Sequence, residues 1–190
     1  MPTDWRGAFF QQAWSDFQIV LLIGGYDAVS DARTPRESAY ILAPCQRLHY
    51  LQMVLEKLGK AYGTPRGGAQ PERNHRGADR LMRHFKQAPD SSNGVILQTL
   101  KFADKRRLYA HIDSLRPMAA AIEALSPNNA GNGPNAEYPW STDPAKPRRS
   151  IVSPARHAFH EAEFDIATIS KLVGFLKAVF KSLEAAGELE

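Results

Sequence analysis

The chain has 190 residues, of which 43% are hydrophobic and 23% are charged, with a formal net charge of +4 and one cysteine. This hydrophobic content supports a substantial core and excludes an intrinsically disordered chain. One cysteine excludes an internal disulfide and a zinc site built on cysteines, and we expect Cys45 to be a small buried residue. The length favours a single helical domain over residues 1–190.

The start of the chain shows no basic segment followed by an apolar core, which is the pattern of a secretory signal. The longest apolar run, Ile19–Ile23, is far shorter than the roughly 20 residues that a membrane span needs. We therefore expect a cytoplasmic protein with no membrane partner. The mildly basic charge allows nucleic acid as a partner without requiring it.

Helical spacing of apolar residues predicts a first helix over about Phe9–Ser30. Gly24 and Gly25 weaken its second half, because each glycine costs about 1 kcal/mol inside a helix. A strand over Phe17–Ile23 is the alternative, but no other segment offers it a partner strand.

The second predicted helix, Pro44–Tyr62, has the clearest periodicity in this part of the chain, and Pro44 suits a first helical position. Its apolar residues recur at steps of three and four: Leu48, Leu51, Leu55, Leu58 and Tyr62. The opposite side carries four polar residues: Gln52, Glu56, Lys57 and Lys60. Glu56 precedes Lys60 by one turn, which is the favourable order for an ion pair.

Glycine and proline punctuation predicts a loop over residues 63–76. A short third helix is expected over Gly77–Gln87, ending before Pro89. A fourth helix should begin after Gly94 and run to about Leu125. Pro117 lies inside it and removes one backbone hydrogen bond, so we expect a kink or break there.

Residues 126–154 are rich in proline, asparagine and glycine and poor in large aliphatic side chains, which predicts a long loop insertion. Ser153 and Pro154 then form a start signal for the last helix. Its apolar residues alternate steps of three and four: Phe159, Ala162, Ile166, Ile169, Val173, Leu176, Phe180 and Leu183. Such a stripe is typical of packing inside a bundle or across a homodimer. The fold class is therefore all-α, an up-and-down bundle of four to five helices.

Arg106 and His111, separated by four residues, are the candidate catalytic pair. A histidine can take a proton from a ribose 2′-OH or give one to the leaving oxygen, while an arginine holds the phosphate. Together they would cleave RNA without a metal or another cofactor. Their spacing does not place them on one helix face, so a basic surface patch is the alternative.

Five further arginines are candidates for binding phosphate or RNA, and the alternative for them is a solvated basic surface. They are Arg107 in the fourth helix and Arg73, Arg76, Arg80 and Arg83 in and before the third. A secondary cluster at the start of the last helix comprises Arg156, His157 and His160. The two histidines could share one helix face, but no second ligand pair accompanies them, so no metal site is predicted.

The segment Tyr50–Tyr62, YLQMVLEKLGKAY, resembles the second helix of HEPN domains. The order that follows is also similar: a short helix with a histidine, a longer helix, an aromatic-proline turn at Glu137–Trp140 and a last amphipathic helix. This resemblance implies an up-and-down helical bundle of a kind that commonly dimerises. The apolar stripe of the last helix predicts that a homodimer forms through that helix.

Many HEPN domains are RNases of toxin–antitoxin and antiviral defence systems, with an Arg-x4–6-His motif assembled across the dimer. Arg106 and His111 match that spacing, and Arg107 loosely matches the family's preference for a polar residue after the arginine. The insertion at 126–154 departs from the family pattern. The alternative is a non-catalytic HEPN-like subunit that binds RNA without cutting it, or a protein partner such as an antitoxin or a defence-complex subunit.

Overall fold

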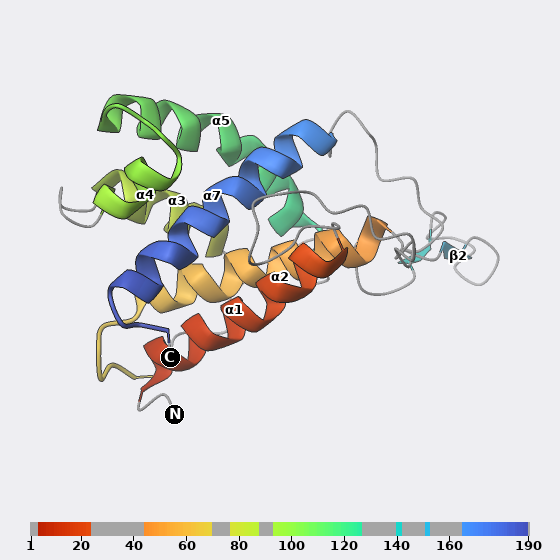
Figure 1. The fold of residues 1–190 in the computed structure, drawn as a ribbon. Coiled ribbons are helices and arrows are strands. Elements are labelled where there is room, and N and C mark those ends of the chain that lie inside the picture. Colours follow the sequence, from red (N-terminus) through yellow and green to blue (C-terminus); the bar gives the residue numbers. More distant parts are fainter. Residues whose placement is uncertain are drawn as a thin grey trace.

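The computed structural model describes residues 4–23, 44–69, 77–87, 93–126, 140–141, 151–152 and 165–189, and these form an all-α bundle (Figure 1). Its helices are α1 (Trp5–Ile23), α2 (Pro44–Gly63), α3 (Gly77–Gln87), α4 (Gly94–Thr99), α5 (Lys105–Ala124) and α7 (Ile166–Ala185). The predicted fold class is therefore confirmed, and the predicted bounds of α2 and α3 agree with the structure to within one residue.

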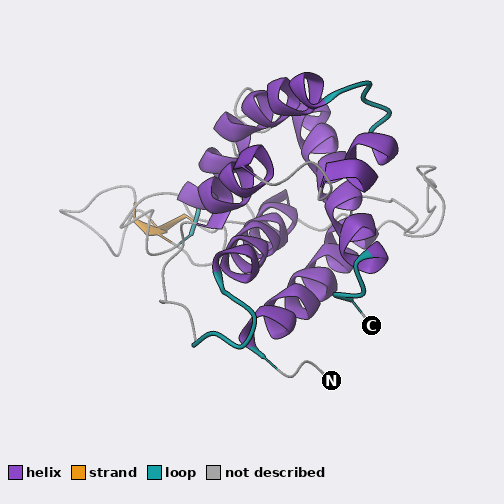
Figure 2. Ribbon diagram, turned by 90° about the vertical axis from the view of Figure 1, so that its left-hand side faces the viewer, coloured by secondary structure: helices purple, strands orange, loops and turns teal. Residues whose placement is uncertain are grey.

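Helix α2 lies at the centre of the packing and contacts α1, α3 and α5, while α7 packs against α4 and α5. Figure 1 shows α1 and α2 side by side and running in opposite directions. Figure 2, turned by 90°, shows the helices enclosing a common interior. A stack of Phe17 on Phe180, with 4.8 Å between ring centroids, joins α1 to α7 inside this core.

Helix α1 begins one turn earlier than the sequence predicts, at Trp5. The Asp4 carboxylate accepts a hydrogen bond from the Gly7 amide at 2.8 Å and so caps the first turn. Its other oxygen accepts from the Gly67 amide, which ties the loop after α2 to this end of α1. The alternative strand over Phe17–Ile23 is wrong, since these residues are helical, and residues 24–30 of the predicted helix lie outside the described ranges.

The predicted fourth helix is divided, but not at Pro117. The break falls between α4 and α5, where Lys101 has a left-handed backbone with φ of 54°. Asp104 then caps α5 by accepting a hydrogen bond from the Arg107 amide at 2.9 Å. Pro117 lies within α5 at an exposed position, where water can replace the bond that its missing N–H would have made.

The last helix begins at Ile166 and not at Ser153, because Asp165 has an extended backbone and caps the Thr168 amide at 2.8 Å. Residues 153–164, with the start signal and the first two stripe positions, lie outside the described ranges. The remaining stripe residues from Ile169 to Leu183 are buried in the bundle, and Ile166 is exposed. The stripe is thus already used inside one chain. No helix in the described ranges combines the length and apolar composition that a membrane span requires.

Two predicted loops are described in part. Residues 64–69 form turns after α2, in which the Thr64 hydroxyl donates to the Lys60 carbonyl at 2.7 Å. Within the predicted insertion at 126–154, β1 (Trp140–Ser141) pairs with β2 (Ile151–Val152) in an antiparallel ribbon, with Trp140 opposite Val152. This short pairing is not predictable from the sequence, because two residues are too few for an alternating pattern.

The polar side of α2 is largely buried in the bundle. Gln52, Glu56 and Lys60 are only 2%, 5% and 8% exposed. The predicted ion pair is present, with the Lys60 ammonium on Glu56 Oε1, and Lys57 approaches the same oxygen at 3.3 Å. Opposite charges that neutralise one another allow a polar face to enter a core. As predicted, Cys45 is a buried free thiol.

Candidate nucleic-acid interface

A group of exposed cations surrounds the start of α5. Lys101, Arg106 and Arg107 are exposed, and no described carboxylate forms an ion pair with any of them. The left-handed turn at Lys101 and the cap at Asp104 hold the three residues at one end of the helix. The partial positive charge of the helix N-terminus adds to theirs. We call Lys101, Arg106 and Arg107 the α5 cationic cluster.

His111 lies on the inner side of α5. Its ring contacts Phe102 at 5.2 Å and Phe175 of α7 at 6.3 Å between centroids. The Nε2 atom is buried and has no hydrogen-bond partner among the described residues. Burial and, to a smaller extent, the nearby Lys171 charge lower the pKa of His111. The imidazole is therefore neutral at pH 7, the state in which a histidine can accept a proton.

The structure does not bring Arg106 and His111 together on one surface of this chain. Five helical positions separate the two Cα atoms by about 140° around the helix axis. Arg106 accordingly faces solvent, whereas His111 is half-buried beside Phe175. A single copy thus presents the phosphate-binding arginine and the proton-accepting histidine on different sides of α5.

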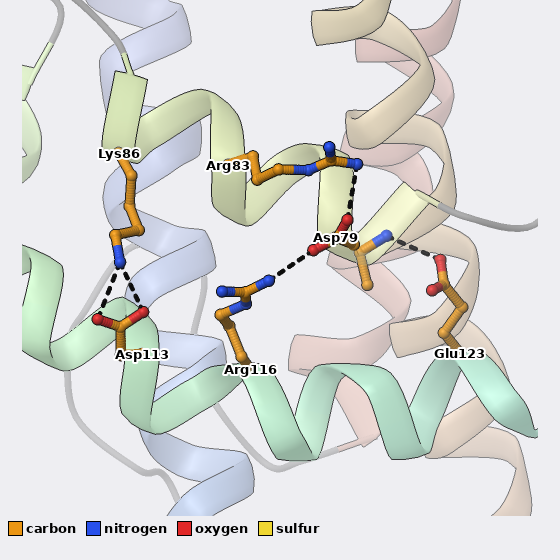
Figure 3. A network of polar contacts seen from close by, with 7 residues as sticks. Asp79, Arg83, Lys86, Asp113, Arg116 and Glu123 are labelled. Carbon is orange, nitrogen blue, oxygen red and sulfur yellow. Dashed lines mark hydrogen bonds and ion pairs between the residues drawn. The ribbon is translucent and has the colours of Figure 1, made fainter.

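Two basic residues of α3, Arg83 and Lys86, form ion pairs within the bundle (Figure 3). Arg83 binds Asp79 at 2.7 Å, and Arg116 of α5 binds the other oxygen of Asp79 at 2.8 Å. Lys86 reaches both oxygens of Asp113 at 2.8 and 2.9 Å. These exposed pairs neutralise the local charge, so Arg83 is a weaker phosphate ligand than the α5 cationic cluster. Arg80 is half-buried, and its side chain lies alongside Gly63 at the end of α2.

The contact between α3 and α5 also includes a helix cap that comes from a distant part of the chain. The Glu123 carboxylate of α5 accepts a hydrogen bond from the Ala78 amide in the first turn of α3 at 2.8 Å (Figure 3). Burial raises the pKa of Glu123, while the bond from Ala78 opposes that shift. The polar contacts between α3 and α5 therefore fix these two helices to each other.

The remaining candidate residues precede α3 and α7 in the chain. Arg73 and Arg76 precede α3, and Arg156, His157 and His160 precede α7; all five lie outside the described ranges. Within the described ranges, no three histidine, cysteine, aspartate or glutamate side chains gather as a cation site.

Lys101 is the one member of the cluster that was not among the candidate residues predicted from the sequence. The basic run from Lys101 to Arg107 is visible in the sequence, but a continuous helix would have placed Lys101 a full turn and more away from Arg106. No family model, no curated protein and no solved structure matches the chain.

Proposed function

We propose that this protein is a HEPN-like RNA-binding protein that contacts RNA through the α5 cationic cluster. The observation that carries the proposal is the exposure of Lys101, Arg106 and Arg107 without a carboxylate partner among the described residues. Neutralising backbone phosphates releases counterions, which is the main source of affinity for single-stranded RNA. Arg83 and Lys86 of α3 have carboxylate partners and gain less from a phosphate.

The catalytic form of this proposal is metal-independent RNA cleavage by Arg106 and His111. Arg106 would hold the scissile phosphate, and the neutral His111 would accept the 2′-OH proton. Because one chain separates the two side chains, cleavage requires a homodimer in which the arginine of one copy serves the histidine of the other. Because the apolar stripe of α7 is buried within one chain, we propose that such a dimer forms through another surface.

The second candidate function is a non-catalytic HEPN-like subunit. The contacts of His111 favour it, since a ring packed on Phe102 and Phe175 with a buried Nε2 also suits a purely structural histidine. In this form the protein binds RNA, or an antitoxin or defence-complex subunit, without cutting RNA. For both candidate functions, we propose a cytoplasmic location.

Replacing Arg106 and Arg107 together by glutamine is expected to weaken binding of a single-stranded RNA about tenfold at moderate salt. The slope of log affinity against log salt should become shallower by about 1.4, because two phosphate contacts are lost. Fluorescence anisotropy with a labelled oligonucleotide at several salt concentrations measures both. Lys181→Gln, which removes an exposed cation from α7, is the matched control and should bind like wild type. An equal loss of RNA affinity in the Arg106/Arg107 double variant and in Lys181→Gln would contradict RNA binding at the α5 cationic cluster.

If the catalytic form is correct, the purified protein cleaves RNA in EDTA, and His111→Ala lowers the rate at least about 100-fold. His111→Asn should be equally inactive while it fills the same space between the two phenylalanine rings. Lys181→Gln, carried through the same purification, should retain the wild-type rate. Cleavage that survives both histidine variants excludes His111 as the base. Wild-type protein that binds RNA and leaves it intact supports the non-catalytic subunit.

A further inference from the structure

His111 lies at the contact between α5 and α7. Its ring contacts Phe102, in the connection between α4 and α5, and Phe175 of α7. Phe175 is fully buried, whereas His111 is only half-buried. The imidazole therefore lies between the core and the surface of the bundle, at a place that a ligand on the surface can influence.

Lys171 of α7 lies beside this imidazole. It precedes Phe175 by one turn, so the two side chains share one side of α7. Side chains in an α-helix lean toward the helix N-terminus, which brings the Phe175 ring, and His111 with it, to the level of Lys171. Burial lowers the pKa of His111, and the nearby charge of Lys171 lowers it further. Among the described residues, Lys171 is the charged group that acts on this imidazole.

The Lys171 ammonium is available to an anionic ligand. The residue is exposed and forms no ion pair with a carboxylate in the described part of the chain. Asp165, six residues earlier, uses its carboxylate to cap α7 through the Thr168 amide at 2.8 Å. Hydrogen bonds from Thr168 hold the pKa of Asp165 low, and the Lys171 charge adds a small contribution. Lys171 is therefore a cation that gains from a phosphate, as the α5 cationic cluster does.

The α5 cationic cluster approaches His111 from the other side. Arg106 precedes His111 by five residues, which is about 7.5 Å along the helix axis. Lys101 is followed directly by Phe102, whose ring contacts the imidazole at 5.2 Å between centroids. The cluster thus reaches one edge of the His111 site, and Lys171 adds a cation at the α7 edge. Cations placed in succession in this way are typical of surfaces that follow the backbone of a single strand.

We propose that Lys171 binds a backbone phosphate of the same single-stranded RNA that the α5 cationic cluster holds, so that the strand passes over His111. This inference rests on the proposed RNA binding, and it requires neither cleavage nor a second copy of the chain. One lysine holds a phosphate weakly. The cluster, however, keeps the strand close, which makes the second contact effectively intramolecular.

Replacing Lys171 by glutamine tests the contact. Lys171→Gln should weaken binding of a labelled single-stranded oligonucleotide about fivefold at moderate salt, and the slope of log affinity against log salt should become shallower by about 0.7. Lys181→Gln removes the same charge from another exposed position of α7 and should bind like wild type. Lys171→Arg keeps the charge and should bind within about twofold of wild type. Thermal unfolding reports that each variant is folded.

The His111 imidazole provides a second measurement, which a general loss of positive charge does not reproduce. Its NMR signal is identified by its absence in His111→Asn, and 2′-O-methyl RNA serves as the ligand because it cannot be cleaved through its 2′-oxygen. Bound RNA should raise the pKa of His111, since a phosphate beside Lys171 favours the imidazolium. Lys171→Gln should raise this pKa without RNA, and RNA should then change it little.

The outcomes separate this contact from the proposed function. If the Arg106/Arg107 double variant loses affinity while Lys171→Gln binds like Lys181→Gln, RNA binds at the α5 cationic cluster and the contact with Lys171 is wrong. A pKa of His111 that bound RNA leaves unchanged also contradicts the contact. A wild-type protein that binds no RNA overturns both the contact and the proposed function.

Discussion

Replacing Gly77 by alanine is expected to destabilise the protein by about 3 kcal/mol, because the first residue of α3 touches the backbone of α2. A Cβ at this position would come within 2.7 Å of the Leu55 carbonyl oxygen and 2.8 Å of the Glu56 carbonyl oxygen. Backbone atoms cannot move aside as a flexible side chain can, so the two helices must separate. Urea unfolding followed by circular dichroism measures the loss, and the melting temperature should fall by about 10 °C.

The same contact predicts a comparable loss for Gly59→Ala, whose Cβ would collide with the Gly77 carbonyl oxygen. Gly174 in α7 is the matched control, since a Cβ there meets nothing within 4 Å. Alanine at position 174 should raise the free energy of unfolding by about 1 kcal/mol through helix propensity. Equal effects of alanine at positions 77 and 174 would show that α2 and α3 do not pack this closely.

Glu56→Gln is expected to cost about 3 kcal/mol of unfolding free energy, because it leaves the charge of Lys60 buried without its anion. Lys60 is only 8% exposed, so water does not compensate for the lost partner. Chemical unfolding of the single variant measures this cost.

The double variant Glu56→Met with Lys60→Met tests the reason for it. Removing both charges leaves an apolar pair of similar size, and such a replacement of a buried ion pair is often neutral or stabilising. We expect the double variant to be more stable than Glu56→Gln. A double variant that is less stable than Glu56→Gln would mean that the ion pair itself supplies net stability.

The elements that the sequence predicted well are those with strong local signals. Apolar spacing and Pro44 defined α2, and Gly77 and Pro89 bracketed α3. The division between α4 and α5 was missed because Pro117 is the more conspicuous helix breaker. The boundary is set by the Asp104 cap and by the left-handed backbone of Lys101. Neither residue type excludes a continuous helix when only the sequence is considered.

The burial of the polar side of α2 depends on information that periodicity does not contain. Charged residues are assigned to solvent by type, but Glu56 and Lys60 neutralise each other and so can lie inside. A pocket at the end of the bundle, where the start of α1 meets the ends of α2 and α7, shows a second limit of prediction from sequence. Arg6, Tyr62, His84 and Glu188 come from four helices or their flanks, and only the tertiary fold places them together.

The cap that Glu123 of α5 provides for α3 makes the stability of one helix depend on the other. A helix normally carries its own cap beside its first residue, whereas the Ala78 amide finds its acceptor 45 residues later in the chain. The first turn of α3 therefore gains its full stability only after α5 has docked, and it opens again when α5 leaves. In native-state hydrogen exchange, the two helices should behave as one cooperative unit with a shared opening free energy.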